Sequence, residues 1–94
     1  MAGILGSSAL QTSQANEEVV PLPPVGWVNV TYKFCKFSFI NDQDCHVKIN
    51  GDTNQIYLRA GQGFEINRSD KKDFLISSFI VVEAGITYNY VGQF

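Results

Sequence analysis

The chain has 94 residues, with seven Lys or Arg against nine Asp or Glu, so its formal net charge is −2 at pH 7. This length allows one domain, and scattered basic residues in an acidic chain argue against DNA or RNA binding, which requires a basic face. The longest apolar run, Phe79-Ile80-Val81-Val82, is far shorter than the roughly 20 residues of a membrane-spanning helix, and Met1-Ala2-Gly3-Ile4-Leu5 lacks the basic residues and apolar length of a signal peptide. We therefore expect a protein made in a cytoplasm that binds neither nucleic acid nor membrane.

Residues 1–26 are predicted to form an extended N-terminal arm. They show no helical or strand period of useful length, and Pro21, Pro23 and Pro24 favour an extended path at the exit. Apolar side chains nevertheless recur along the arm, whereas a purely solubilising tail has few of them. The arm is then either a disordered leader or a segment that becomes ordered on a neighbouring subunit, and we favour the second. The contact residues predicted on it are Ile4, Leu5, Leu10, Val19, Val20 and Leu22.

Residues 27–94 are predicted to form the folded domain, because the pattern changes at Trp27. Apolar and polar residues alternate over residues 28–34, which is the period of a β-strand. The apolar parity then flips to Cys35, Phe37 and Phe39. Such a flip indicates a bulge near residues 34–36 or a strand covered on both faces, and it suggests a strand that bends between two sheets.

Turn residues divide the rest of the domain into short strands. The turns are predicted at Asn41-Asp42-Gln43-Asp44, at Asn50-Gly51, at Gly61-Gln62-Gly63 and at Glu83-Ala84-Gly85, and Asn-Gly is the strongest signal among them. Residues 74–83 are the most apolar segment and are predicted to form a central buried strand. Six or seven short strands without a helical pattern predict an all-β fold, a small antiparallel β-sandwich or barrel.

Cys35 and Cys45 are predicted to be reduced. If residues 41–44 formed a hairpin loop, Ile40 would lie opposite Cys45 and Cys35 opposite Asn50, which separates the two sulfur atoms too far for a disulfide. Two cysteines without CxxC spacing and the single His46, on the outward parity of its strand, do not make a zinc site. We therefore expect no metal, no cofactor and no catalytic activity.

Two aromatic residues are candidates for binding. Tyr57 falls on the polar parity of its strand, beside Gln55 and Arg59, so an exposed ring there could stack on a sugar, dock a partner, or simply cover a neighbouring side chain. Trp27 stands where the domain begins. A carbohydrate-binding or adhesive β-module that uses one of these rings is one functional hypothesis.

A family resemblance provides another hypothesis. It rests on Val47-Lys48-Ile49-Asn50-Gly51, on Ile56-Tyr57-Leu58-Arg59-Ala60-Gly61-Gln62-Gly63-Phe64 and on Ser78-Phe79-Ile80-Val81-Val82-Glu83-Ala84-Gly85-Ile86-Thr87-Tyr88. These stretches resemble small β-sandwich virion proteins of tailed bacteriophages, of the decoration, head-fibre or tail-accessory type. The resemblance implies a non-enzymatic structural subunit in a virion assembled in the host cytoplasm. It also implies a homo-oligomer whose arm joins it to capsid or tail proteins of the same particle.

Overall fold

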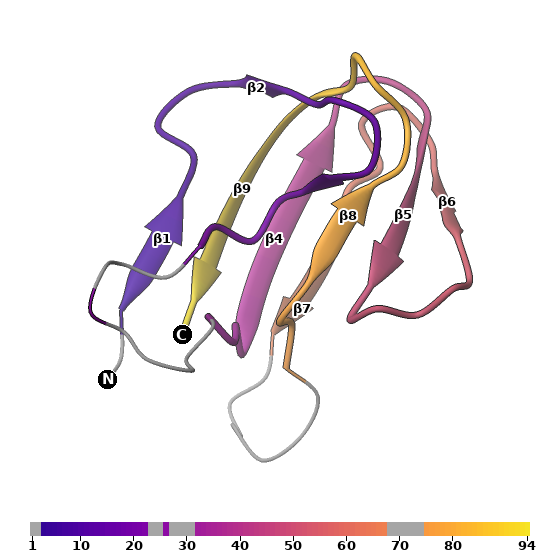
Figure 1. The fold of residues 1–94 in the computed structure, drawn as a ribbon. Coiled ribbons are helices and arrows are strands. Elements are labelled where there is room, and N and C mark those ends of the chain that lie inside the picture. The colour runs from indigo at the N-terminus through magenta and orange to yellow at the C-terminus, as the bar shows by residue number, and fades with distance from the viewer. Residues whose placement is uncertain (1–2, 23–25, 27–31, 68–74) are drawn as a thin grey trace.

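The structure is a computed structural model that describes residues 3–22, 26, 32–67 and 75–94, and these residues form two antiparallel β-sheets (Figure 1). The strands are β1 (Ile4–Gly6), β2 (Gln11–Thr12), β3 (Glu17–Glu18), β4 (Lys36–Asn41), β5 (Cys45–Ile49), β6 (Ile56–Leu58), β7 (Phe64–Asn67), β8 (Phe79–Val81) and β9 (Thr87–Gln93). Sheet A has the order β1-β9-β4-β7, with β2 also paired to β9, and sheet B has the order β3-β8-β5-β6. The predicted antiparallel β-sandwich is confirmed. The described residues include no helix that is long and apolar enough to cross a membrane.

The strand order is that of a jelly roll. β1 and β2 pair with successive parts of β9, since Ile4 lies opposite Gln93 and Gln11 lies opposite Tyr88, so they act as two halves of one strand. With these halves counted together, the strands follow the orders 1-8-3-6 and 2-7-4-5 in the two sheets. Jelly rolls are double-sheet folds of eight strands that combine two Greek keys.

The pairing is nested around one turn. β5 pairs with β6, β4 with β7, β3 with β8, and β1 and β2 with β9, so the chain resembles one long hairpin folded over on itself. At the innermost turn, Asn50 and Gly51 have φ angles of 54° and 75°, and the Asp52 N–H donates to the Ile49 carbonyl at 3.0 Å. Asn-Gly favours this left-handed pair of conformations, and the predicted turn is confirmed.

The segment between β4 and β5 is a crossing between sheets, which corrects the hairpin considered for residues 41–44. β4 lies in sheet A and β5 in sheet B, so Ile40 is not opposite Cys45. The cause is Asn41, whose side chain is fully buried. Its Nδ2 donates to the carbonyl oxygens of Gln43 at 2.7 Å and Arg59 at 3.0 Å, and its Oδ1 accepts from the Gly63 N–H at 2.9 Å. These bonds satisfy the buried amide at the corner where the chain leaves sheet A.

Cys35 marks a second change of partner and agrees with the predicted bend. Phe34 bridges to Ile76 through two backbone hydrogen bonds of 2.8 and 2.9 Å. One residue later, the Cys35 N–H donates to the Gln93 carbonyl of sheet A at 2.9 Å. Both cysteines are free and buried, as expected.

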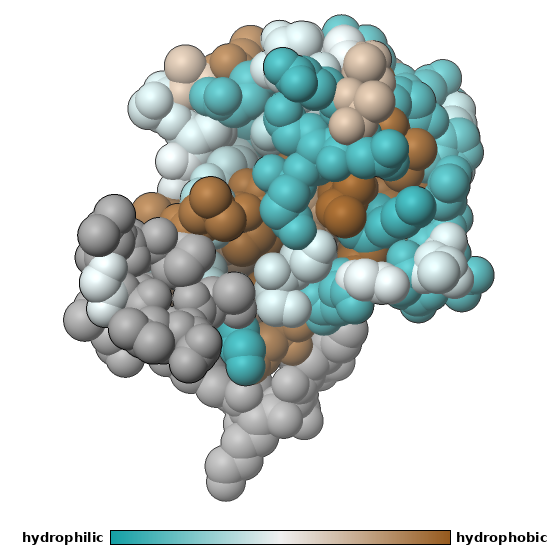
Figure 2. Space-filling view, viewed as in Figure 1, coloured by the Kyte–Doolittle hydropathy of each residue, from teal (hydrophilic) through white to brown (hydrophobic). Residues whose placement is uncertain are grey.

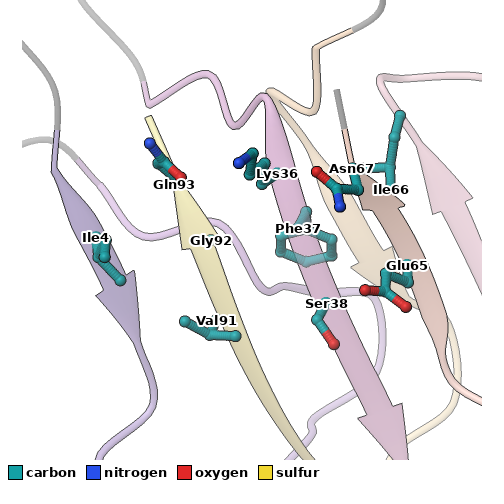
Figure 3. Close-up of a pocket in the computed structure, with 10 residues that line it drawn as sticks. All are labelled: Ile4, Lys36, Phe37, Ser38, Glu65, Ile66, Asn67, Val91, Gly92 and Gln93. Carbon is teal, nitrogen blue, oxygen red and sulfur yellow. The ribbon is translucent and has the colours of Figure 1, made fainter. Parts of the chain in front are cut away.

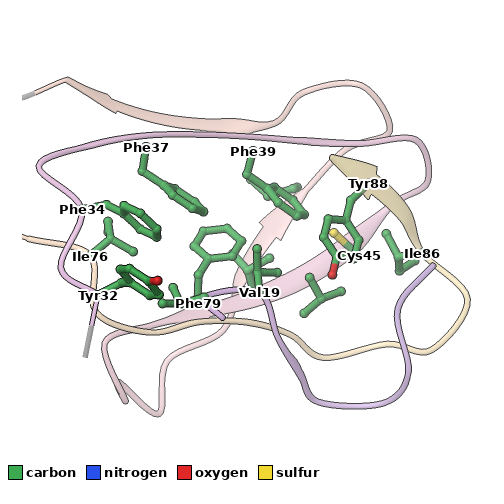
Figure 4. Packing of buried hydrophobic residues seen from close by; sticks show 14 residues of the cluster. Val19, Tyr32, Phe34, Phe37, Phe39, Cys45, Ile76, Phe79, Ile86 and Tyr88 are labelled. Carbon is green, nitrogen blue, oxygen red and sulfur yellow. The ribbon is translucent and has the colours of Figure 1, made fainter. Parts of the chain in front are cut away.

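The core between the two sheets combines aromatic rings with aliphatic side chains (Figure 4). Phe37 and Phe39 of β4 point inward, as the parity predicts, and their ring centroids lie 5.1 and 4.7 Å from that of Phe79 on β8. The ring of Tyr88 on β9 lies 5.4 Å from Phe39. Aromatic pairs at these separations contribute about 0.5–1.5 kcal/mol each beyond their buried area. β8 lies between β3 and β5 in sheet B, which agrees with the predicted central strand, although it spans only Phe79–Val81 of the predicted residues 74–83 and residue 74 lies outside the described part.

The N-terminal segment, defined here as residues 3–22, lies within the sandwich, whereas we expected residues 1–26 to extend away from it as an arm. Its strands form one edge of each sheet, and Val19 and Val20 are 4% and 6% exposed in the core. Fully burying a valine side chain stabilises a fold by about 1.5–3 kcal/mol. Strands of two and three residues are too short to show a period, so the sequence pattern did not reveal them.

Ser13 anchors the segment where it passes from sheet A to sheet B. Its Oγ donates to the Glu83 carbonyl at 2.7 Å and accepts from the Ile86 N–H at 3.0 Å. Its backbone N–H donates to the Ile86 carbonyl at 2.8 Å, and its carbonyl accepts from the Gly85 N–H at 2.7 Å. Ser13 is thereby fixed to the connection between β8 and β9. Gly85, in the turn predicted at residues 83–85, has a φ of 82°, which lies in the left-handed region.

We predict that Ser13→Ala lowers the free energy of unfolding by about 1–3 kcal/mol, because two buried backbone groups lose their hydrogen-bond partner. Urea denaturation measures this loss. The matched control is Ser7→Ala, since the Ser7 hydroxyl also contacts the backbone of β9, at 3.4 and 3.1 Å from Tyr90 atoms, but is only partly buried. Water replaces a partner there, so the control should lose less. Equal losses in the two variants would contradict the anchoring role of Ser13.

Candidate interaction surfaces

The residues predicted to contact a partner do not gather in one place. Four of them are exposed in the structure: Ile4, Leu10, Leu22 and Tyr57. Leu5 packs against the core opposite Gly92, and Val19 and Val20 belong to the core itself, so these three do not face outward in this conformation. Trp27 lies outside the described residues.

Tyr57 is the centre of a polar and aromatic cluster on the outer face of sheet B. It lies on β6 directly opposite His46 on β5, its side chain is 51% exposed, and the two ring centroids are 5.3 Å apart. The Tyr57 hydroxyl also forms a hydrogen bond with Asp44, which raises the pKa of Tyr57 above its ordinary value. The phenol ring is therefore held in place while one face remains open to solvent.

Glu83 positions the imidazole of this cluster. Its carboxylate accepts a hydrogen bond from the His46 backbone N–H at 2.7 Å and lies 2.5 Å from His46 Nδ1. Burial by itself would raise the pKa of Glu83, but the backbone and ring hydrogen bonds of His46 outweigh it and hold the pKa below its ordinary value. Glu83 thus stays ionised at neutral pH and fixes the ring that packs beside Tyr57.

Asp44 provides a second ionised carboxylate, at the hydroxyl of Tyr57. The Ala60 N–H donates to it at 2.8 Å, and this bond, followed by that of the Tyr57 hydroxyl, lowers the pKa of Asp44. Two carboxylates beside an exposed aromatic face suit a ligand with hydroxyl donors and an apolar face, as a sugar has. We name Asp44, His46, Tyr57 and Glu83 the Tyr57 cluster.

The neighbouring Cys45 points the other way, into the core. Burial, assisted by the nearby carboxylate of Glu83, raises the pKa of its thiol to about 11. The thiolate is the reactive form of cysteine, so Cys45 is held in its unreactive form near neutral pH. In the part of the chain that the structure describes, no group of three or more His, Cys, Asp or Glu side chains could hold a metal ion.

A second surface is an open groove of about 240 Å³ on the outer face of sheet A. Ile4 of β1 and Val91 of β9 are diagonal neighbours on the paired strands that line it (Figure 3), and they are 73% and 48% exposed. Lys36 and Glu65 flank them on β4 and β7. Among the described residues, neither side chain forms an ion pair. We name this the sheet A groove.

Apolar side chains elsewhere do not merge into a broad patch. Figure 2 shows one face of the molecule, on which brown apolar atoms reach the surface in small areas separated by teal hydrophilic ones. Single exposed apolar residues are ordinary on a protein surface. The sheet A groove stands out because its apolar residues lie on the adjacent strands β1 and β9, next to charges of both signs on β4 and β7 that form no ion pair among the described residues.

Comparison of the chain with protein-family models, with curated proteins and with solved structures found no match.

The sequence indicated part of both surfaces. The parity of β6 identified Tyr57 and that of β5 placed His46 outward, but the Glu83 partner is 37 positions away from His46 and no local pattern connects them. Val91 was not predicted, although the two-residue period of β9 would place it on the outer face beside Gln93. Its proximity to Ile4 depends on the pairing of β1 with β9, which local patterns do not specify.

The lowered pKa of Glu83 predicts a pH-dependent contribution to stability. A lowered carboxyl pKa stabilises the fold at pH values above the unfolded pKa, about 4.5, and this contribution is lost as the pH falls through the folded pKa. We expect Glu83→Gln to destabilise the protein at about pH 5 by no more than about 1 kcal/mol, because solvent screens the partly exposed pair, and the difference from wild type should be smaller at about pH 2.5.

Urea denaturation at both pH values measures this difference, with Glu65→Gln as the control. Glu65 is an exposed carboxylate without an ion pair among the described residues, so its substitution should have little effect at either pH. A Glu83→Gln difference that stays the same or grows in acid would show that the carboxylate is not held by His46.

Proposed function

We propose that this chain is a non-enzymatic structural protein of a bacteriophage particle, a homo-oligomeric subunit that decorates or joins capsid or tail proteins. The observation that carries the proposal is the jelly-roll strand order of the two sheets. Viral capsid domains are among the proteins built on this fold. The argument from fold to function is an analogy, and it agrees with the resemblance carried by residues 47–51, 56–64 and 78–88.

The sheet A groove is the contact surface that we propose for the neighbouring subunit. Ile4 and Val91 provide an apolar centre, and Lys36 and Glu65 provide charges of both signs at its border. An apolar centre with a polar rim is the usual anatomy of a protein interface. The proposed contact surface is thus a sheet face that includes the exposed Ile4 of the N-terminal segment. Val19 and Val20 are buried in the core and are not part of it.

The test is incorporation into particles of the phage that encodes the chain. We expect mass spectrometry of purified particles to detect the wild-type chain in multiple copies, and we expect Val91→Asp to abolish its incorporation because a charge replaces the apolar centre of the groove. Asn89→Asp is the matched control, since Asn89 is exposed on the same face of β9 and receives the same charge. Particles without the wild-type chain, or equal incorporation of the two variants, would refute the proposal. Deletion of residues 1–26 is unsuitable here, since it removes core residues.

The Tyr57 cluster supports a second candidate function, carbohydrate binding. An exposed aromatic ring that packs against His46 and is bonded to Asp44, with the ionised carboxylate of Glu83 on His46, matches the needs of sugar recognition. A jelly roll is also the fold of many lectin domains. This function would be compatible with a place on a virion surface.

A glycan array tests this candidate. If the cluster binds sugars, Tyr57→Ala should remove the binding signal because the stacking face is lost. Tyr57→Phe should retain most of it, because only the hydroxyl that contacts Asp44 is removed. An array without hits, or hits that survive Tyr57→Ala, would exclude this cluster as a sugar site.

A further inference from the structure

We infer that the N-terminal segment is exchanged between two copies of this chain, so that residues 3–22 of each copy complete the sandwich of the other. The inference concerns the pure protein and does not depend on the proposed place in a virus particle. It assigns a partner, a second copy of this chain, to the two sheet edges that the segment covers.

The first support is the position of the segment in the fold. β1 and β2 lie at the edge of sheet A beside β9, and β3 lies at the edge of sheet B beside β8. Without the segment, the remaining strands still form two continuous sheets, in the orders β9-β4-β7 and β8-β5-β6. The segment can therefore leave and dock without threading through the rest of the molecule.

The second support is that, among the described residues, the hydrogen bonds between the segment and the rest of the chain all involve residues 78–94. Ser13 binds backbone atoms of Glu83, Gly85 and Ile86, and the Val19 N–H donates to the Phe79 carbonyl at 2.8 Å. At the other end, Gly3 and Phe94 exchange two backbone hydrogen bonds of 3.0 and 2.9 Å. A segment from a second copy makes the same contacts, because none of them depends on which chain supplies it.

The third support is the exit from the segment. Pro21 is followed in the sequence by Pro23 and Pro24, and proline favours an extended path over a tight reversal. A hinge that is strained when a segment folds back on its own chain invites domain swapping. Leu22 lies between these prolines and is 90% exposed, so its side chain is accessible to a second copy.

The balance between the two forms depends on concentration. The segment makes the same contacts in the monomer and in the exchanged dimer. The monomer is therefore favoured over the dimer mainly because the segment is tethered to its own sheets, which gives it an effective concentration on the order of millimolar. The dimer should therefore form when the protein is refolded at about 1 mM. It should be rare when the protein is refolded at micromolar concentration.

The test uses full-length double-cysteine variants and a short bifunctional maleimide. Ile4 and Gln93 lie opposite each other on β1 and β9, so in Ile4→Cys/Gln93→Cys the reagent links the segment to its acceptor. Neighbouring strands place such a pair roughly 5 Å apart. In Ser38→Cys/Val91→Cys, the linked residues lie on β4 and β9, both outside the segment. The native cysteines are buried and should not react.

After refolding at high concentration, dimers are isolated by size exclusion with light scattering, diluted, linked and analysed on a denaturing gel. Exchange predicts that the Ile4–Gln93 variant becomes a covalent dimer, whereas the Ser38–Val91 variant gives only monomers linked within one chain. Covalent monomers from both variants would mean that intact monomers associate through another surface, which overturns the inference. Light scattering of the wild-type chain provides an independent check, and a monomer at every concentration would also overturn it.

Discussion

The sandwich depends on the crossing at Ser13. A chain that leaves sheet A and enters sheet B must turn away from its hydrogen-bonded partners, and backbone groups buried at such a point are costly unless they are satisfied. The hydroxyl and the backbone of Ser13 satisfy these groups, because together they form hydrogen bonds with the connection between β8 and β9. The same contacts hold both sheets at a common corner, so the edge of each sheet is closed by one short segment.

Because the strand pairing is nested, we expect the N-terminal segment to close the two sheet edges late in folding and as a separate step. The innermost hairpin, β5 with β6, joins residues close in sequence, whereas β1 and β9 lie at opposite ends of the chain. Contacts between residues far apart in the sequence form slowly, because closing the long loop between them costs conformational entropy before the contact is made. Until residues 3–22 dock, the edges of β8 and β9 are unpaired, and unpaired edges are templates for another strand. The topology therefore connects folding of the monomer with the strand exchange that we infer.

Local patterns predicted the features that local chemistry determines. Alternation placed Phe37 and Phe39 in the core, and Asn50-Gly51 predicted the innermost turn. They did not predict which sheet a strand joins, because that depends on distant partners: residues 41–44 have the composition of a hairpin loop, yet the buried Asn41 binds the loop at 59–63 and directs the chain into the other sheet. The strands of the N-terminal segment were not predicted, and the reason is the opposite one. They are too short to have a pattern, and backbone pairing stabilises them.

The outer faces of the two sheets differ in whether their charged side chains have hydrogen-bond or ion-pair partners among the described residues. On sheet B, Glu83 binds His46, Asp44 binds Ala60 and Tyr57, and Glu18 accepts from the Ser78 hydroxyl and the Phe79 N–H. A carboxylate fixed in advance loses little entropy on binding, which agrees with the small ligand proposed for this face. On sheet A, Lys36 and Glu65 lack ion-pair partners among the described residues and flank exposed apolar side chains. A protein surface with charges opposite to those of Lys36 and Glu65 gains the most binding free energy on sheet A. The two faces therefore favour different classes of partner.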